Sequence, residues 1–201
     1  LPGVRRVERS RHFRPLLETS TPFIHAPEAW RGVSGGLTGE GIRIGIIDSG
    51  IDYFHAHFGG SGDFLEFFDN DPAVIEEGTF PTAKVAGGTD FVGDSYDSSG
   101  LEGSPTPRPD PDPVDDIFSG HGTHVAGIAA GFGVLSDGAT FTGDYRTLND
   151  FAQFEVGPGV APGATLYALK VFGPRGTTDF DIVVQALEWA LDPDGDGDFS
   201  D

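Results

Sequence analysis

Cysteine is absent from this sequence of 201 residues. Its absence excludes disulfide bonds, zinc sites built on thiolates, and catalysis by a cysteine nucleophile. The sequence also lacks a run of about 18 apolar residues, which a membrane-spanning helix needs, and it has no apolar segment near its start that fits a signal peptide. These features predict a domain that folds around a hydrophobic core without covalent cross-links and without a membrane partner.

Basic residues are scarce, since 12 Lys and Arg stand against 32 Asp and Glu, for a net charge of −20. Nucleic-acid phosphates would be repelled by such a chain, so we expect no nucleic-acid partner. Solubility, or a habitat of high salt, explains the charge. Calcium ions held by some of the carboxylates are a second and compatible explanation.

The scarce basic residues cluster at the start, where five arginines fall within residues 1–14. Because the sequence opens on Leu rather than Met, we expect it to begin inside a longer precursor. We predict a separate basic segment at residues 1–18 and one domain at residues 19–201. An acidic, proline-rich insertion at about residues 61–118 is expected to form a surface excursion, because residues 63–116 hold 14 acidic residues and two basic ones.

Apolar patterning predicts an α/β fold with a parallel sheet sandwiched by helices. Strands are expected at residues 42–48 and 86–92 and within 160–173, and helices at 26–31, 123–131 and 179–191. Residues 18–24 are expected to be extended and turn-prone. Ligands of such folds lie beyond the carboxyl ends of the strands, and Asp48 stands at one of these ends.

Asp48 and His121 are the residues with the clearest chemical meaning. His121 opens a glycine-rich apolar helix, where an imidazole can act as a base for a hydroxyl nucleophile. A carboxylate such as Asp48 would fix the tautomer of that imidazole and stabilise its protonated form. The positive end of the helix dipole is expected to keep His121 neutral at pH 7.

Histidines in this position are open to other roles. A single histidine is commonly a hydrogen-bonded packing residue. His121 and His124 could bind zinc together with His55 or His57, but no glutamate follows in the pattern of a zinc peptidase. A dinucleotide site is also disfavoured, because the strand that ends at Asp48 lacks the glycine-rich turn that such sites require.

Three motifs, in order along the chain, resemble the subtilases, the family of subtilisin-like serine endopeptidases. They are Asp48-Ser49-Gly50-Ile51-Asp52 with His55, His121-Gly122-Thr123-His124-Val125-Ala126-Gly127, and Gly159-Val160-Ala161-Pro162-Gly163-Ala164.

The resemblance implies a three-layer fold in which Asp48 is the orienting acid and His121 the general acid and base. It implies polypeptide substrates whose backbone pairs with the segment containing Gly176 and Thr177. It further implies a secreted protein whose first 18 residues are the end of an inhibitory propeptide, which would make the propeptide a partner of the domain.

The family pattern continues with an oxyanion-hole asparagine and a serine in Gly-Thr-Ser-Met-Ala, and neither is found in this sequence. We therefore expect the chain to be the N-terminal part of a subtilase, with a fold incomplete at its C-terminus and no peptidase activity alone. Asp48 and His121 are separated by 73 positions, a longer spacing than in compact family members. The alternative is a non-catalytic fragment or pseudoenzyme that binds peptide or calcium.

The end of the sequence contains a possible calcium loop. Asp192, Asp194 and Asp196, followed by Gly197, reproduce the opening of an EF-hand loop, in which alternating carboxylates supply oxygen ligands. An acidic loop that ends the preceding helix is the competing interpretation. Calcium would have a structural role here, and we expect no cofactor in catalysis.

Overall fold

The computed structural model describes residues 17–32, 36–193 and 195–197. No helix within these ranges is long and apolar enough to cross a membrane. Along the chain the elements are α1 (Leu17–Phe23), α2 (Ala26–Arg31), β1 (Arg43–Asp48), the 3₁₀ helix η2 (Ala56–Phe58), α3 (Phe64–Asp69), β2 (Val85–Asp90), α4 (His121–Ala130), β3 (Val134–Leu135), the 3₁₀ helix η3 (Tyr145–Thr147), β4 (Phe154–Val156), β5 (Thr165–Lys170) and α5 (Phe180–Leu191).

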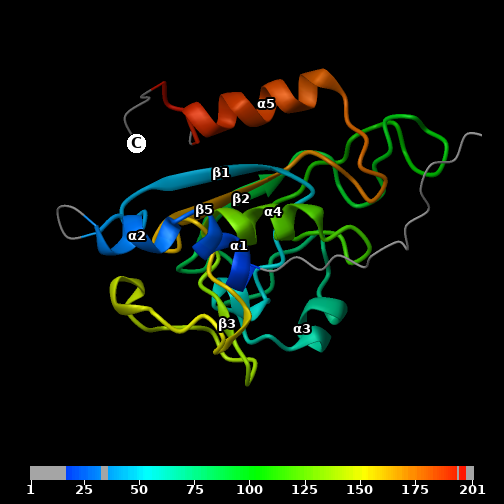
Figure 1. The fold of residues 1–201 in the computed structure, drawn as a ribbon. Helices are drawn as coiled ribbons and strands as arrows, with labels where there is room; N and C mark the ends of the chain where they lie inside the picture. The colour runs from blue at the N-terminus through cyan, green and yellow to red at the C-terminus, as the bar shows by residue number, and fades with distance from the viewer. Residues whose placement is uncertain (1–16, 33–35, 194, 198–201) are drawn as a thin grey trace, which may run out of the picture.

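The centre of the molecule is a parallel sheet in the order β1-β5-β2. Asp48 at the end of β1 and Asp90 at the end of β2 both lie opposite Lys170 at the end of β5. Figure 1 shows α5 over one face of the sheet and α4 on the other. The predicted α/β fold with a parallel sheet between helices is therefore confirmed, and its carboxyl edge carries charged side chains.

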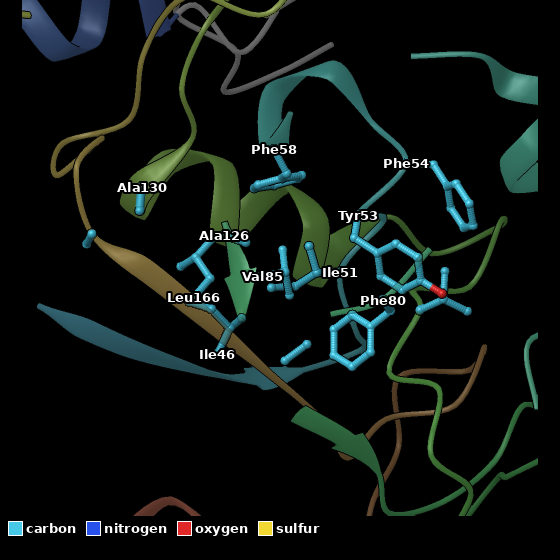
Figure 2. Packing of buried hydrophobic residues seen from close by; sticks show 13 residues of the cluster. Ile46, Ile51, Tyr53, Phe54, Phe58, Phe80, Val85, Ala126, Ala130 and Leu166 are labelled. Atoms are coloured by element: carbon cyan, nitrogen blue, oxygen red, sulfur yellow. The ribbon is translucent and has the colours of Figure 1, made fainter. Parts of the chain in front are cut away.

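Neighbouring residues of each strand pack on opposite faces, as the alternation of side chains along a strand requires. Ile46 and Leu166 belong to a buried cluster with Ala126 and Ala130 of α4, which Figure 2 shows in close view. On the opposite face the buried cluster includes Leu169 of β5 together with Ile182 and Ala186 of α5; Ile47 of β1 packs against it. The small alanines on both helices allow close approach to the sheet.

The prediction for residues 18–24 is wrong, because most of them form helix α1. The sequence gives little sign of a helix here, since Ser, Thr and Pro are weak helix formers. A tertiary contact supplies what propensity lacks: Thr21 is 1% exposed, and its hydroxyl donates to the carbonyl of Pro158 at 2.9 Å. The packing partner is far along the chain, which explains why a local pattern misses it.

The strand expected at residues 86–92, within the acidic segment, is confirmed as β2 of the central sheet. The segment is more deeply buried than the expected surface excursion, because its Phe80 and Val114 lie in the core. Asp90 is fully buried because the ammonium of Lys170 lies 3.0 Å from its Oδ2, and the same ammonium lies 2.5 Å from Asp94 Oδ1. Part of the negative charge is therefore neutralised inside the protein. The boundaries of the insertion at about residues 61–118 stay a prediction.

Candidate functional site

Asp48 is the last residue of β1, and its position is fixed by the sheet. Its backbone carbonyl accepts hydrogen bonds from the N–H groups of Val171 and Phe172, at 2.8 and 3.3 Å, just beyond β5. The backbone N–H of Ser49 donates to Oδ1 of Asp48 at 2.8 Å. The carboxylate is thus held at the carboxyl edge of the sheet, with its side chain only 12% exposed.

His121 is the first residue of α4 and meets Asp48 directly. Its Nδ1 lies 2.7 Å from Oδ1 of Asp48. Because a carboxylate can only accept a hydrogen bond, the proton of this bond resides on Nδ1. The neutral ring then has an unprotonated Nε2, and the side chain is 70% exposed, so Nε2 is accessible to another molecule. An imidazole in this state can take up a proton from a hydroxyl group.

The helix dipole was expected to disfavour the imidazolium form of His121, and the contact with Asp48 acts in the opposite direction. The hydrogen bond that His121 donates to Asp48 raises the pKa of His121 above its ordinary value of 6.5, with further contributions from the charges of Asp48 and Asp115. A full negative charge at hydrogen-bond distance outweighs the partial charge of a helix terminus. The imidazolium is stabilised, which suits a group that must hold a proton during a reaction.

A surface pocket opens beside the pair and contains one of the two predicted substrate-binding residues. Gly176 lines it, in a left-handed conformation with φ of 65°, whereas Thr177 is not among its lining residues. The hydroxyl of Thr177 donates to Oδ1 of Asp97 at 3.0 Å and accepts from the N–H of Ser98 at 3.2 Å. The full lining is Asp48, Ser49, Ser119, His121, Phe172, Pro174, Arg175 and Gly176.

Three polar residues behind the pair were not predicted. The carboxylate of Asp115 accepts hydrogen bonds from the hydroxyl of Ser49, just after β1, and from the hydroxyl of Thr123 in α4. Asp115 ends the acidic segment, and composition alone cannot separate it from the solvated carboxylates around it. Ser49 and Thr123 lie inside two of the motifs that resemble the subtilases, and that position is the only feature of the sequence that points to them.

The possible metal ligands are not gathered into a metal centre in the part of the chain that the structure describes, where no group of three His, Asp or Glu side chains could hold an ion. His57 uses both ring nitrogens in protein hydrogen bonds, to the carbonyl of Gly127 and from the N–H of Gly133.

At the C-terminal end, Asp194 lies outside the described residues. The carboxylate of Asp192 accepts the backbone N–H groups of Asp196 and Gly197, at 3.1 and 3.0 Å. The carboxylate of Asp192 thus organises the start of the loop, and calcium binding there stays a prediction.

Comparison with known proteins gives a consistent result. The pattern of the subtilase family matches residues 39–197. The chain is 31% identical to the minor extracellular protease Vpr of Bacillus subtilis (strain 168) over 182 residues, which cover 90% of this chain and 16% of that protein.

Two further relatives match over similar stretches. Serine protease AprX of the same organism is 27% identical, over 94% of this chain and 29% of its own length. Subtilisin DY of Bacillus licheniformis is 28% identical, over 77% of this chain and 34% of its own length. The chain thus spans between about a sixth and a third of the length of these relatives.

Proposed function

This chain belongs to the subtilase family, and we propose that it supplies the acid–base pair of a secreted serine endopeptidase. The observation that carries the proposal is the contact of 2.7 Å between Nδ1 of His121 and Oδ1 of Asp48. Two motifs that stand 73 positions apart meet at the carboxyl edge of the sheet, where an α/β fold presents its chemistry.

In the proposed reaction His121 carries the proton. Its Nε2 accepts the proton of a serine hydroxyl as that oxygen attacks the peptide carbonyl, and then gives the proton to the departing amine. Asp48 holds the ring through Nδ1 and stabilises the imidazolium between the two steps. The Gly-Thr-Ser-Met-Ala segment that carries the serine nucleophile in the family pattern is not found in this sequence. No serine of this chain is therefore given that role, and we expect no cleavage by the 201-residue chain alone.

Substrate polypeptides are proposed to bind along the segment that follows β5. Gly176 lines the same pocket as His121, and its missing side chain leaves the backbone open to an extended peptide. Thr177 would act there through its hydrogen bonds to the acidic segment rather than through the pocket wall. An inhibitory propeptide at residues 1–18 and structural calcium at Asp192, Asp194 and Asp196 complete the proposal; residues 1–16 lie outside the described residues.

The test is peptide hydrolysis by the product of the complete reading frame that encodes this chain. His121→Ala is expected to lower kcat/KM by about 10²–10⁴-fold, the usual contribution of a positioned acid–base group. His124→Ala is the matched control, because His124 is an exposed residue of the same helix that does not line the pocket of the pair, and it should leave kcat/KM unchanged.

Equal activity of the wild type and His121→Ala would contradict the proposed role. If the wild type binds unfolded polypeptide, or calcium, but hydrolyses nothing, the alternative of a non-catalytic binding protein is supported instead.

A further inference from the structure

Asp115 is a buried carboxylate that the proposed proton transfer does not use. It is 3% exposed and lies six residues before α4. Its Oδ1 accepts from the hydroxyl of Ser49 and from the N–H of Asp116, both at 2.8 Å. Its Oδ2 accepts from the N–H and the hydroxyl of Thr123, at 2.9 and 2.6 Å. Burying a carboxylate is costly unless hydrogen bonds replace its water, and here four donors do so.

The first turn of α4 depends on these bonds. Helices need partners for their first N–H groups, and the residue before α4 is Gly120, which has no side chain to offer. The N–H of Thr123 is instead satisfied by Asp115, and the N–H of Gly122 by the hydroxyl of Ser49 at 2.9 Å. The turn that carries His121 is therefore capped from outside the helix.

The same carboxylate also determines the surroundings of Asp48. Because Asp115 can only accept, the hydroxyl of Ser49 must point its hydrogen at Asp115, which leaves its lone pairs for Gly122. Ser49 is thereby held so that its own N–H donates to Oδ1 of Asp48, the oxygen that contacts His121. One carboxylate thus restrains both halves of the pair.

We propose that Asp115 is a positioning residue that holds the end of β1 and the start of α4 in register, so that Nδ1–H of His121 meets Oδ1 of Asp48. A role of Asp115 in catalysis rests on the proposed function, whereas its positioning of the two side chains can be measured without any hydrolysis. Asp115 touches no reacting atom. It acts through Ser49 and through the first turn of the helix.

Several charged groups lie near His121, and a test must separate their effects on its pKa. Asp48 approaches from β1, Asp115 from the segment before α4, and Arg175 from the loop after β5, where it lines the same pocket. Replacing Asp115 by Asn removes a charge that favours imidazolium. It also exchanges one accepting oxygen for an amide donor, so that either Ser49 or Thr123 loses its acceptor.

The experiment is a histidine NMR titration of the whole chain, with the signal of His121 assigned by its loss in His121→Gln. Asp115→Asn is expected to lower the pKa of His121 by roughly half a pH unit or more. Asp116→Asn is the matched control. It makes the same change of charge one residue away, at a carboxylate that accepts the N–H of Phe118 at 2.8 Å. Equal shifts in the two variants would overturn the proposal.

A second variant decides the question if Asp115→Asn does not fold. Ser49→Ala deletes only the hydroxyl that links Asp115 to the pair. It should weaken the low-field signal of the His121 Nδ1 proton through faster exchange with water. A signal identical to that of the wild type would count against the proposal. Since hydrolysis plays no part in either readout, failure of the proposed function and failure of the positioning role give different results.

Discussion

Two histidines near α4 show how strongly local surroundings determine the chemistry of one residue type. His121 is largely exposed and its Nδ1–H donates to the carboxylate of Asp48, so its pKa rises. His57 is 4% exposed, and burial lowers its pKa to about 4. Its neutral ring donates from Nε2 to the carbonyl of Gly127 and accepts at Nδ1 from the N–H of Gly133, both at 3.2 Å. One ring is arranged to gain a proton and the other to remain neutral.

The neutral state of His57 predicts a loss of stability in mild acid. Its folded pKa of about 4 lies below the ordinary 6.5, so its contribution is present above pH 6.5 and is lost as pH falls toward 4. Between pH 7 and pH 5 this group should remove about 2 kcal/mol from the free energy of unfolding. Urea unfolding of the wild type and of His57→Gln at both pH values measures the difference, because glutamine can donate and accept without titrating.

His25→Gln serves as the control for this measurement, since His25 is an exposed histidine and should lose as much stability as the wild type. The comparison between variants is needed because Asp52 has the opposite effect. Burial raises the pKa of its carboxyl to about 6, so it favours the folded state as pH falls. If His57→Gln weakens in acid as much as the wild type, the buried ring is not the cause.

At the level of elements, the contact between β1 and α4 determines whether Asp48 and His121 meet. Gly122 lies directly against the chain just after β1. A Cβ atom built on it would approach the carbonyl oxygen of Gly50 to 2.2 Å and the N–H nitrogen of Ser49 to 3.1 Å. No side chain fits in that space, so glycine is what allows the first turn of the helix to approach the strand end.

Gly122→Ala is therefore expected to reduce stability, although alanine is the better helix former by about 1 kcal/mol. Overpacking against backbone should cost about 1–3 kcal/mol and move His121 away from Asp48. Thermal melting measures the loss of stability. The displacement of His121 should lower its pKa, which NMR titration measures. Gly45→Ala in β1 is the control, since its Cβ would make only an ordinary contact of 3.7 Å with Leu169. A stabilised Gly122→Ala would contradict this packing.

Much of the central layer could be predicted from the sequence, because the apolar residues of its strands and helices recur at short, regular intervals along the chain. Helix α2 has the expected bounds, and β1, β5, α4 and α5 lie within a few residues of the expected ranges. Asp48 was expected at the carboxyl end of a strand and His121 at the start of a helix. Their pairing was expected from the chemistry of an acid–base pair and from the subtilase resemblance, and the two side chains are in contact. These features depend on short-range patterns and on one topological rule.

What could not be predicted depends on long-range contacts. Helix α1 is joined to the rest of the domain by the hydrogen bond from Thr21 to Pro158, which stand 137 positions apart. The role of Asp115 depends on Ser49 and Thr123, and a carboxylate in an acidic stretch gives no sign of such partners. His121 was expected to stay neutral at pH 7 because of the helix dipole, since the short distance to Asp48, which raises its pKa, cannot be read from a sequence.

At the scale of the whole molecule, the net charge of −20 opposes compactness. Buried pairing relieves part of this repulsion, as Lys170 does between Asp90 and Asp94. Other carboxylates, such as Asp112 and Asp115, are also buried. Between the carboxylates that are exposed at the surface, salt screens the repulsion over about 10 Å at 0.1 M ionic strength. The stability of this protein should therefore depend on its ionic surroundings more than that of a balanced domain does.

Raising NaCl from about 0.05 to about 1 M, at which the screening length falls to about 3 Å, is expected to raise the urea midpoint of unfolding. KCl at the same concentrations should act equally, because screening does not depend on the cation. A constant or falling midpoint would contradict the role given to charge repulsion. An increase already at millimolar CaCl₂, absent with MgCl₂ and in Asp192→Asn, would support the predicted calcium loop instead.

The most direct test of the Asp48–His121 pair is the pKa of His121 in the wild type and in Asp48→Asn, measured by NMR titration of the chain. The contact of 2.7 Å predicts a wild-type value above 6.5, because protonation is favoured by the hydrogen bond and charge of Asp48. Asp48→Asn should lower that value, because a neutral amide no longer stabilises the imidazolium. An unchanged pKa in Asp48→Asn would show that the two residues do not act as a pair.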